Sequence, residues 1–214
     1  MKGFLDGIRR PEKVSLARGV LSSSLLLVAG VMMGIVSKVL DSIPGNQLPY
    51  FLEVLDLRNF FSRLGVWMFL GVLITVRSKS PFLAAIHVFL FLAGMVGSYY
   101  WYTAHVLGFF PRSYMMVWVG MTIVSPVLGF VCWYAKGKGA AGLWISSIIV
   151  MLLARQAFSF GWWYFEIRYV LELILWIAAI IILYRSPGQT AGMIAIGMVL
   201  FMLTAHVYIP WERS

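Results

Sequence analysis

Seven long apolar blocks, separated by polar connectors, dominate the pattern of this chain. A helix needs about 20 apolar residues to cross a hydrocarbon core of about 30 Å, and each block comes near that length. The blocks lack the alternating period of barrel strands, so they favour membrane-spanning helices. They cover residues 16–39, 60–76, 82–102, 114–134, 140–158, 165–184 and 191–208. The sequence therefore predicts an all-α, polytopic transmembrane helical bundle of about seven spans, or six if the last block does not cross.

The connectors divide into one long segment and several tight turns. The longest lies between the first two blocks, where residues 48–57 place Pro49 near a helix start and put Glu53 and Asp56 three positions apart on one face. This pattern predicts a short amphipathic helix on the outer surface. The turns at 77–81, 136–139 and 185–189 leave no room for an intracellular catalytic domain. Residues 1–214 are therefore expected to form a single membrane domain.

The composition and the distribution of charge support this interpretation. The chain is 61% hydrophobic and 12% charged, with a mean hydropathy of +0.88. If the N-terminus is cytoplasmic, the inner side holds ten basic residues against Asp6 and Glu12, whereas the charges of the outer side nearly cancel. The positive-inside rule then predicts an N-terminus inside and a C-terminus outside the cell membrane of a bacterium. The net charge of +9 is a topological signal, and no basic face with interleaved aromatic residues indicates a nucleic-acid partner. The inner basic residues are Lys2, Arg9, Arg10, Lys13, Arg18, Arg77, Lys79, Lys136, Lys138 and Arg185.

Charged residues at membrane depth are costly and call for a reason. Arg155 and Glu172 flank the connector around Gly161–Trp163 at nearly equal sequence distance, so an antiparallel helix pair brings them to similar depth. Two interpretations remain open. The residues form a buried ion pair that fixes two helices, or both line a polar cavity that opens to the outside.

Further charged and aromatic residues are expected at the same outer level. Small-molecule pockets combine aromatic walls with a few convergent polar groups. We therefore predict a cavity for a small polar or charged solute, an organic cation being one class that aromatic walls would bind. The predicted ligand-binding residues are Lys38, Arg63, Trp67, Tyr99, Arg155 and Glu172.

Catalytic signatures are missing from the sequence. It contains no G-x-S-x-G, no H-E-x-x-H and no P-loop, and His87 and His105 lie about 27 Å apart along one predicted helix, too far to share a metal ion. We predict no catalytic residues, no metal site and no cofactor, although an intramembrane enzyme is not excluded.

Small residues spaced four apart let membrane helices approach closely. Gly30 and Gly34 form a G-x-x-x-G in the first block, and the pairs Ala93–Gly97 and Ala191–Ala195 repeat the spacing. These residues serve either packing within the bundle or, at Gly30 and Gly34, contact with a partner membrane subunit.

Several stretches resemble a family of uncharacterised multi-pass proteins from Gram-positive bacteria. They are residues 34–42, 64–67 with 77–81, 99–100, and 125–129 with 137–139. In architecture the chain is similar to the S components of energy-coupling factor transporters, in which a compact helical subunit captures a vitamin or metal from outside and docks on a shared energising module. This resemblance implies an integral membrane solute-binding or transport subunit. The alternatives are a structural or regulatory membrane subunit that docks on a partner, and a membrane-embedded enzyme.

Overall fold

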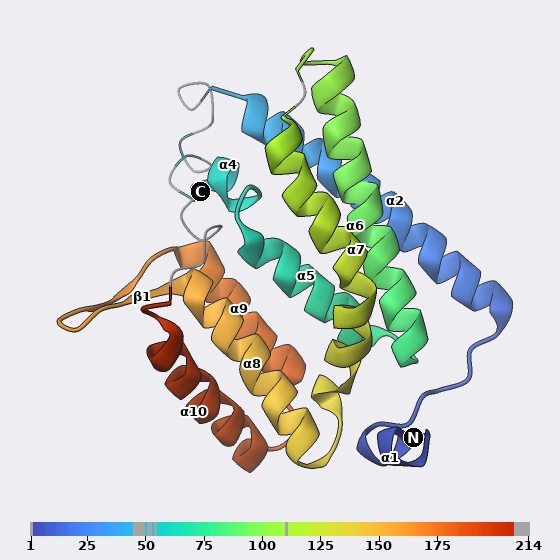
Figure 1. Cartoon of the computed structure of the whole chain (residues 1–214), viewed down its shortest axis with the longest axis vertical. Coiled ribbons are helices and arrows are strands. Elements are labelled where there is room, and N and C mark those ends of the chain that lie inside the picture. The colour runs from blue at the N-terminus through green and yellow to red at the C-terminus, as the bar shows by residue number, and fades with distance from the viewer. Residues whose placement is uncertain (1, 45–49, 51–52, 54, 110, 208–214) are drawn as a thin grey trace. The chain divides into compact units, whose positions relative to one another are not determined.

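A computed structural model describes residues 2–44, 50, 53, 55–109 and 111–207 of the chain. It is helical apart from one small hairpin and divides into two compact units (Figure 1). Unit 1 comprises Met1–Arg10, Arg63–Val76 and Cys132–Ser214, and unit 2 comprises Pro11–Ser62 and Arg77–Val131.

Unit 2 contains three long helices. They are α2 (Leu16–Ser42), α6 (Pro81–His105) and most of α7 (Arg112–Trp133), together with the short α4 (Leu57–Phe60). Half of the predicted amphipathic helix at 48–57, namely residues 48, 49, 51, 52 and 54, lies outside the described residues.

Unit 1 contains the remaining elements. The helices are α1 (Lys2–Ile8), α5 (Leu64–Arg77), α8 (Gly139–Ala157), α9 (Val170–Leu183) and α10 (Pro187–Thr204), and a 3₁₀ turn, η2, covers Tyr134–Lys136. Strands β1 (Phe158–Phe160) and β2 (Phe165–Ile167) pair antiparallel, with Ser159 opposite Glu166. In Figure 1 this hairpin extends beyond the ends of α8 and α9.

All seven apolar blocks contain a helix, which confirms the all-α prediction at the level of fold class. Five of these helices are long and apolar enough to cross a membrane, whereas α5 and α9 have 14 residues each. Helix α9 begins five positions after the predicted start at Phe165, because Phe165–Ile167 pairs as β2 with Phe158–Phe160. The number of membrane crossings and their direction therefore stay predictions.

The predicted tight turns do connect successive helices. Two of them end in a Ser-Pro pair that opens the next helix. The Ser80 side chain accepts a hydrogen bond from the Leu83 N–H at 3.2 Å, and Ser186 accepts one from Gln189 at 3.4 Å. A serine N-cap followed by proline satisfies the unpaired N–H groups of a helix start, so these starts were encoded locally.

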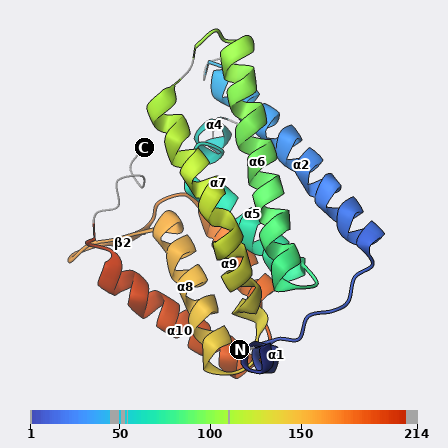
Figure 2. The same ribbon diagram turned by 45° about the vertical axis from the view of Figure 1, so that its right-hand side comes forward.

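Helices α2 and α6 of unit 2 run parallel at very short range. A Cβ atom placed on Gly30 would lie 2.0 Å from the Phe91 carbonyl oxygen, and one on Gly34 would lie 2.3 Å from that of Met95. The Ser98 hydroxyl donates across the same interface to the Val31 carbonyl at 2.9 Å. Gly30 and Gly34 therefore serve packing within the bundle, between α2 and α6, which is the first of the two roles expected for them. Contact with a partner subunit stays a prediction. Figures 1 and 2 both show α2 beside α6.

The other predicted small-residue pairs are also displaced from the actual contacts. On α6 the close approach is made by Gly94, whose added Cβ would lie 2.6 Å from the Leu27 carbonyl, while Gly97 has open space around it. On α10, Ala191 and Ala195 are exposed and Gly197 packs on α8. In these two pairs, the small residues mark helices that do pack closely, but not the faces that make the contact.

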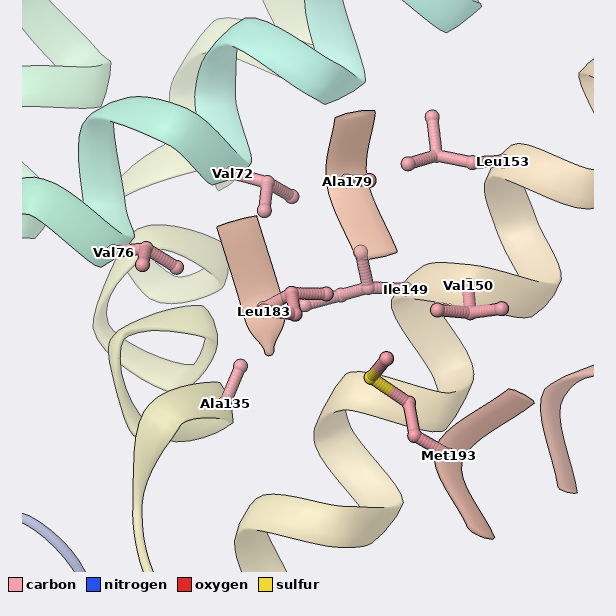
Figure 3. Close-up of a cluster of buried hydrophobic side chains, with 9 residues drawn as sticks. All are labelled: Val72, Val76, Ala135, Ile149, Val150, Leu153, Ala179, Leu183 and Met193. Carbon is pink, nitrogen blue, oxygen red and sulfur yellow. The ribbon is translucent and has the colours of Figure 1, made fainter. Parts of the chain in front are cut away.

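Unit 1 is built around a core of branched aliphatic side chains. Figure 3 shows nine buried residues from α5, η2, α8, α9 and α10 converging on one centre. Gly197 on α10 lets that helix approach α8, since a Cβ there would lie 3.0 Å from the Ser147 carbonyl. The Trp176 indole on α9 donates to the Val150 carbonyl at 3.2 Å. The nine residues are Val72, Val76, Ala135, Ile149, Val150, Leu153, Ala179, Leu183 and Met193.

Candidate functional site

The six predicted ligand-binding residues divide between the two units. Lys38 and Tyr99 belong to unit 2, whereas the other four, Arg63, Trp67, Arg155 and Glu172, belong to unit 1. Four of the six are buried, namely Lys38, Trp67, Arg155 and Glu172, with exposed fractions of 2% for Glu172 and 6% for Arg155. Arg63 and Tyr99 are partly buried.

In unit 2, Lys38 lies in a small polar cluster near the end of α2. Its Nζ is 2.7 Å from Asp41 Oδ2, and the Tyr99 hydroxyl donates to the same oxygen at 3.1 Å. The ammonium also lies 4.9 Å from the centre of the Tyr99 ring and 5.3 Å from that of Phe109, within the range of cation–π contact. Lys38 and Tyr99, which the sequence analysis placed in one predicted site, do lie together in this cluster. Asp41, one turn after Lys38, neutralises its charge.

In unit 1, Glu172 forms an ion pair with Arg63, the residue that precedes α5. The Arg63 Nε donates to Glu172 Oε1, and the Arg63 guanidinium carbon lies 3.9 Å from the centre of the Tyr169 ring. Glu172 is in the first turn of α9, where the helix dipole favours a carboxylate. Gly65 leaves room for it, since an added Cβ would lie 3.3 Å from Glu172 Cγ. The starts of α5 and α9 are thus joined by this charge pair.

The predicted ion pair between Arg155 and Glu172 is wrong. Arg155 NH2 donates to the Val207 carbonyl at 2.9 Å, and NH1 donates to the Thr204 carbonyl. Thr204 is the last residue of α10 and Val207 lies three positions beyond it, at the end where a helix leaves its last C=O groups without partners. A cation there satisfies the carbonyls and opposes the negative end of the helix dipole. Arg155 therefore caps α10.

A pocket of about 580 Å³ opens beside Arg155, where the hairpin meets the ends of α8 and α10. Its walls combine aromatic rings with two arginines and a histidine. The described lining residues are Arg155, Phe158, Ser159, Phe160, Gly161, Trp162, Trp163, Tyr164, Arg168, Phe201, Ala205, His206 and Val207. Of the six residues predicted from the sequence, only Arg155 is among them.

The aromatic walls of the pocket are held by mutual packing. The Trp162 and His206 rings stack with centroids 5.1 Å apart and planes 13° apart. Phe160 lies edge-on to Phe201 at 6.2 Å, and Phe158 stacks on Phe165 at 5.2 Å. Ring pairs of this geometry are preferred in protein interiors. The hairpin and α10 therefore present a preformed aromatic surface.

Sequence reasoning missed Arg168, His206 and the phenylalanines of the hairpin as site residues. The sequence around Trp162 is densely aromatic, and such density at the outer end of an apolar block leads to the expectation of an interfacial belt of amphipathic rings. Trp163, 97% exposed, fits that expectation. The signal that was available is the alternation Phe158-Ser159-Phe160 before Gly161, a strand and turn pattern.

Comparisons with family models, curated proteins and solved structures find no match to this chain. Several long apolar helices indicate a membrane protein. The resemblance to S components stays a prediction.

Proposed function

We propose that this chain is an integral membrane solute-binding or transport subunit whose solute enters the pocket between the hairpin, α8 and α10. The observation that carries the proposal is the pocket itself, with its aromatic walls and its few charged groups. Its volume of about 580 Å³ lies within the range of about 300–1,000 Å³ typical of small-molecule sites.

The proposed orientation places this pocket outside. An N-terminus inside and seven crossings put the turn before α10 on the cytoplasmic side and the hairpin on the outer side, in line with the excess of basic residues in the inner connectors. Helices α5 and α9 are each about 21 Å long at 1.5 Å per residue, so they would cross with local thinning of the bilayer.

Within this proposal the charged groups have different roles. Arg155 belongs to the pocket wall, whereas Arg63 and Glu172 join α5 to α9. Lys38 with Tyr99 in unit 2, and the buried Trp67 in unit 1, stay predicted ligand contacts whose substitution is still worth testing.

A structural or regulatory subunit is the second candidate. Helix α2 favours it, because only 11% of its most apolar window is buried within the protein. Lipid or a partner membrane helix would cover the remaining face.

A thermal-shift screen of the purified full chain in an uncharged detergent tests the proposal. The panel contains vitamins, nucleobases, amino acids, organic cations, organic anions and metal ions. A solute at a hundred times its Kd stabilises the native state by about 2.7 kcal/mol, enough to raise the melting temperature. Ala205→Trp, which fills the pocket, should abolish that rise, while Ala191→Trp on the exposed face of α10 should preserve it.

A screen without any stabilising solute would favour the alternative function. If no solute stabilises the wild type and a membrane protein copurifies with it, the pocket is not a solute site and the subunit alternative is the better account. The same screen on Arg63→Ala and Trp67→Ala tests the wider set of predicted contacts.

A further inference from the structure

We propose that the pocket of unit 1 selects an organic anion, with a phosphate or carboxylate group joined to an apolar or aromatic body. This inference rests on the proposed function and names its ligand class. The described residues that line the pocket include Arg155, Arg168 and His206, and none of them is Asp or Glu.

The cationic side of the pocket is positioned by the main chain. The backbone N–H of Arg168 donates to the Ala157 carbonyl at 2.8 Å, so the residue after β2 is fixed against the end of α8. Arg155 is fixed on the carbonyls at the end of α10. The Arg168 guanidinium in the pocket wall matches the planar, two-oxygen geometry of phosphate and carboxylate groups, and Arg155 adds a second positive charge to the same pocket.

The aromatic side of the pocket fits an apolar body attached to that anion. Phe160 and Trp162 belong to the hairpin, and Phe201 and His206 belong to α10 and its end. Because their rings pack on one another, they are held in place before a ligand binds. Preorganised rings lose little conformational entropy when they bind a flat or aliphatic group.

An organic cation fits this pocket poorly. The carboxylate that sequence reasoning assigned to such a ligand, Glu172, is engaged with Arg63, and it does not line the pocket. Glu166 lies on β2 but is not among the lining residues either. Two arginines, with no Asp or Glu among the described residues of the lining, would repel a cation at short range.

Two sources supply an anion of this chemistry. One is a water-soluble organic phosphate or carboxylate, and the other is the headgroup of an anionic membrane lipid. Both place an anion on the arginines and an apolar part on the rings.

Isothermal titration of the full chain in an uncharged detergent separates these sources. Phenyl phosphate is the soluble probe, dihexanoyl phosphatidylglycerol the lipid probe, dihexanoyl phosphatidylcholine the zwitterionic control and benzyltrimethylammonium the cationic control. Tighter binding of phenyl phosphate than of the controls supports the proposal with a soluble source. Preference for phosphatidylglycerol over phosphatidylcholine supports it with a lipid source.

Substitution of Arg168 assigns the binding to this pocket. Arg168→Gln should raise the Kd of the anion by about 10- to 100-fold, the loss carried by one charge-assisted hydrogen bond, and Arg168→Lys should recover part of it. Arg112→Gln removes the same charge from an exposed position at the start of α7, outside the pocket, and should leave the Kd unchanged. The melting temperature of each variant without ligand shows whether it folds.

Two results would overturn the proposal. Binding of the cation or of a neutral solute that Ala205→Trp abolishes and Arg168→Gln spares would refute the anion class while leaving the proposed function intact. Equal Kd values for the anion in wild type and a folded Arg168→Gln would also refute it. If nothing binds in either this titration or the wider screen, the proposed function fails together with its ligand class.

Discussion

In unit 2, α2 and α6 approach until glycines on each helix meet the other's backbone, whereas in unit 1 larger side chains and buried charges separate and fix the helices. The charge in unit 2 lies near the end of α2, where Asp41 is one-third exposed. In unit 1, Arg155 and Glu172 are almost completely buried, and the pocket opens beside Arg155.

This difference shows two ways to join helices in an apolar environment. Backbone contact at Gly30 and Gly34 needs no polar group, so it leaves little space between the helices. A buried guanidinium must be fully hydrogen-bonded, and the carbonyls and carboxylates that satisfy it determine which elements meet. A binding site is therefore expected in the unit that uses charge.

The largest expected effect comes from breaking the ion pair of unit 1. Glu172→Gln leaves the Arg63 guanidinium buried without its carboxylate, and should lower the free energy of unfolding by about 3 to 5 kcal/mol. Denaturant unfolding in detergent, or steric trapping in bilayers, measures the change. In a double-mutant cycle with Arg63→Gln the two losses should be strongly non-additive. Additive losses would show that the two residues act independently.

The next effect tests the backbone contact of unit 2. Gly30→Ala forces a methyl group against the Phe91 carbonyl, and we expect a loss of about 3 kcal/mol, at the upper end for overpacking. Gly97→Ala on α6 is the matched control, because the added methyl group meets open space. Equal stability of the two variants would argue against the α2–α6 contact.

A smaller effect is expected at the cap of α10. Arg155→Gln removes a charged donor from the Thr204 and Val207 carbonyls and should cost about 1.5 to 3 kcal/mol. Hydrogen exchange should then accelerate in the last turn of α10 before other helices respond. Arg112→Gln, an exposed arginine at a helix start, should change neither quantity. Unchanged exchange at the end of α10 in Arg155→Gln would contradict the capping role.

The smallest effect is expected for an exposed ion pair in unit 2. Glu12 Oε2 lies 2.6 Å from Lys79 Nζ, but the two side chains are 67% and 55% exposed. Water and salt screen such pairs, so Glu12→Gln should stay within about 1 kcal/mol of wild type. A loss comparable to that of Glu172→Gln would mean that burial does not govern the strength of these pairs.

The helices were predictable because hydropathy records burial in lipid along each continuous block. The turn at Ser80–Pro81 was predictable because its N-cap chemistry is local. The hairpin was not predictable, because the aromatic residues of Phe158–Phe160 and Phe165–Ile167 continue the neighbouring apolar blocks without a break in hydropathy.

Contacts between residues far apart in the sequence were harder still to predict. Arg63 and Glu172 lie 109 positions apart, and only the packing of α5 on α9 brings them together. Arg155 binds main-chain carbonyls, which carry no side-chain signature in the sequence. The burial of Arg155 and Glu172 was therefore predictable from their positions in apolar blocks, whereas the contacts of these two side chains were not.

Cysteine labelling in intact cells tests most directly whether the pocket of a membrane protein opens to the outside. In a Cys132→Ala background, one cysteine is placed at Trp163 in the hairpin and, in a second variant, at Gly188 in the turn that begins α10; both positions are exposed. A membrane-impermeant maleimide should label Trp163→Cys in intact cells and Gly188→Cys only after the membrane is opened. Labelling of Gly188→Cys but not Trp163→Cys in intact cells would place the pocket inside and contradict the account.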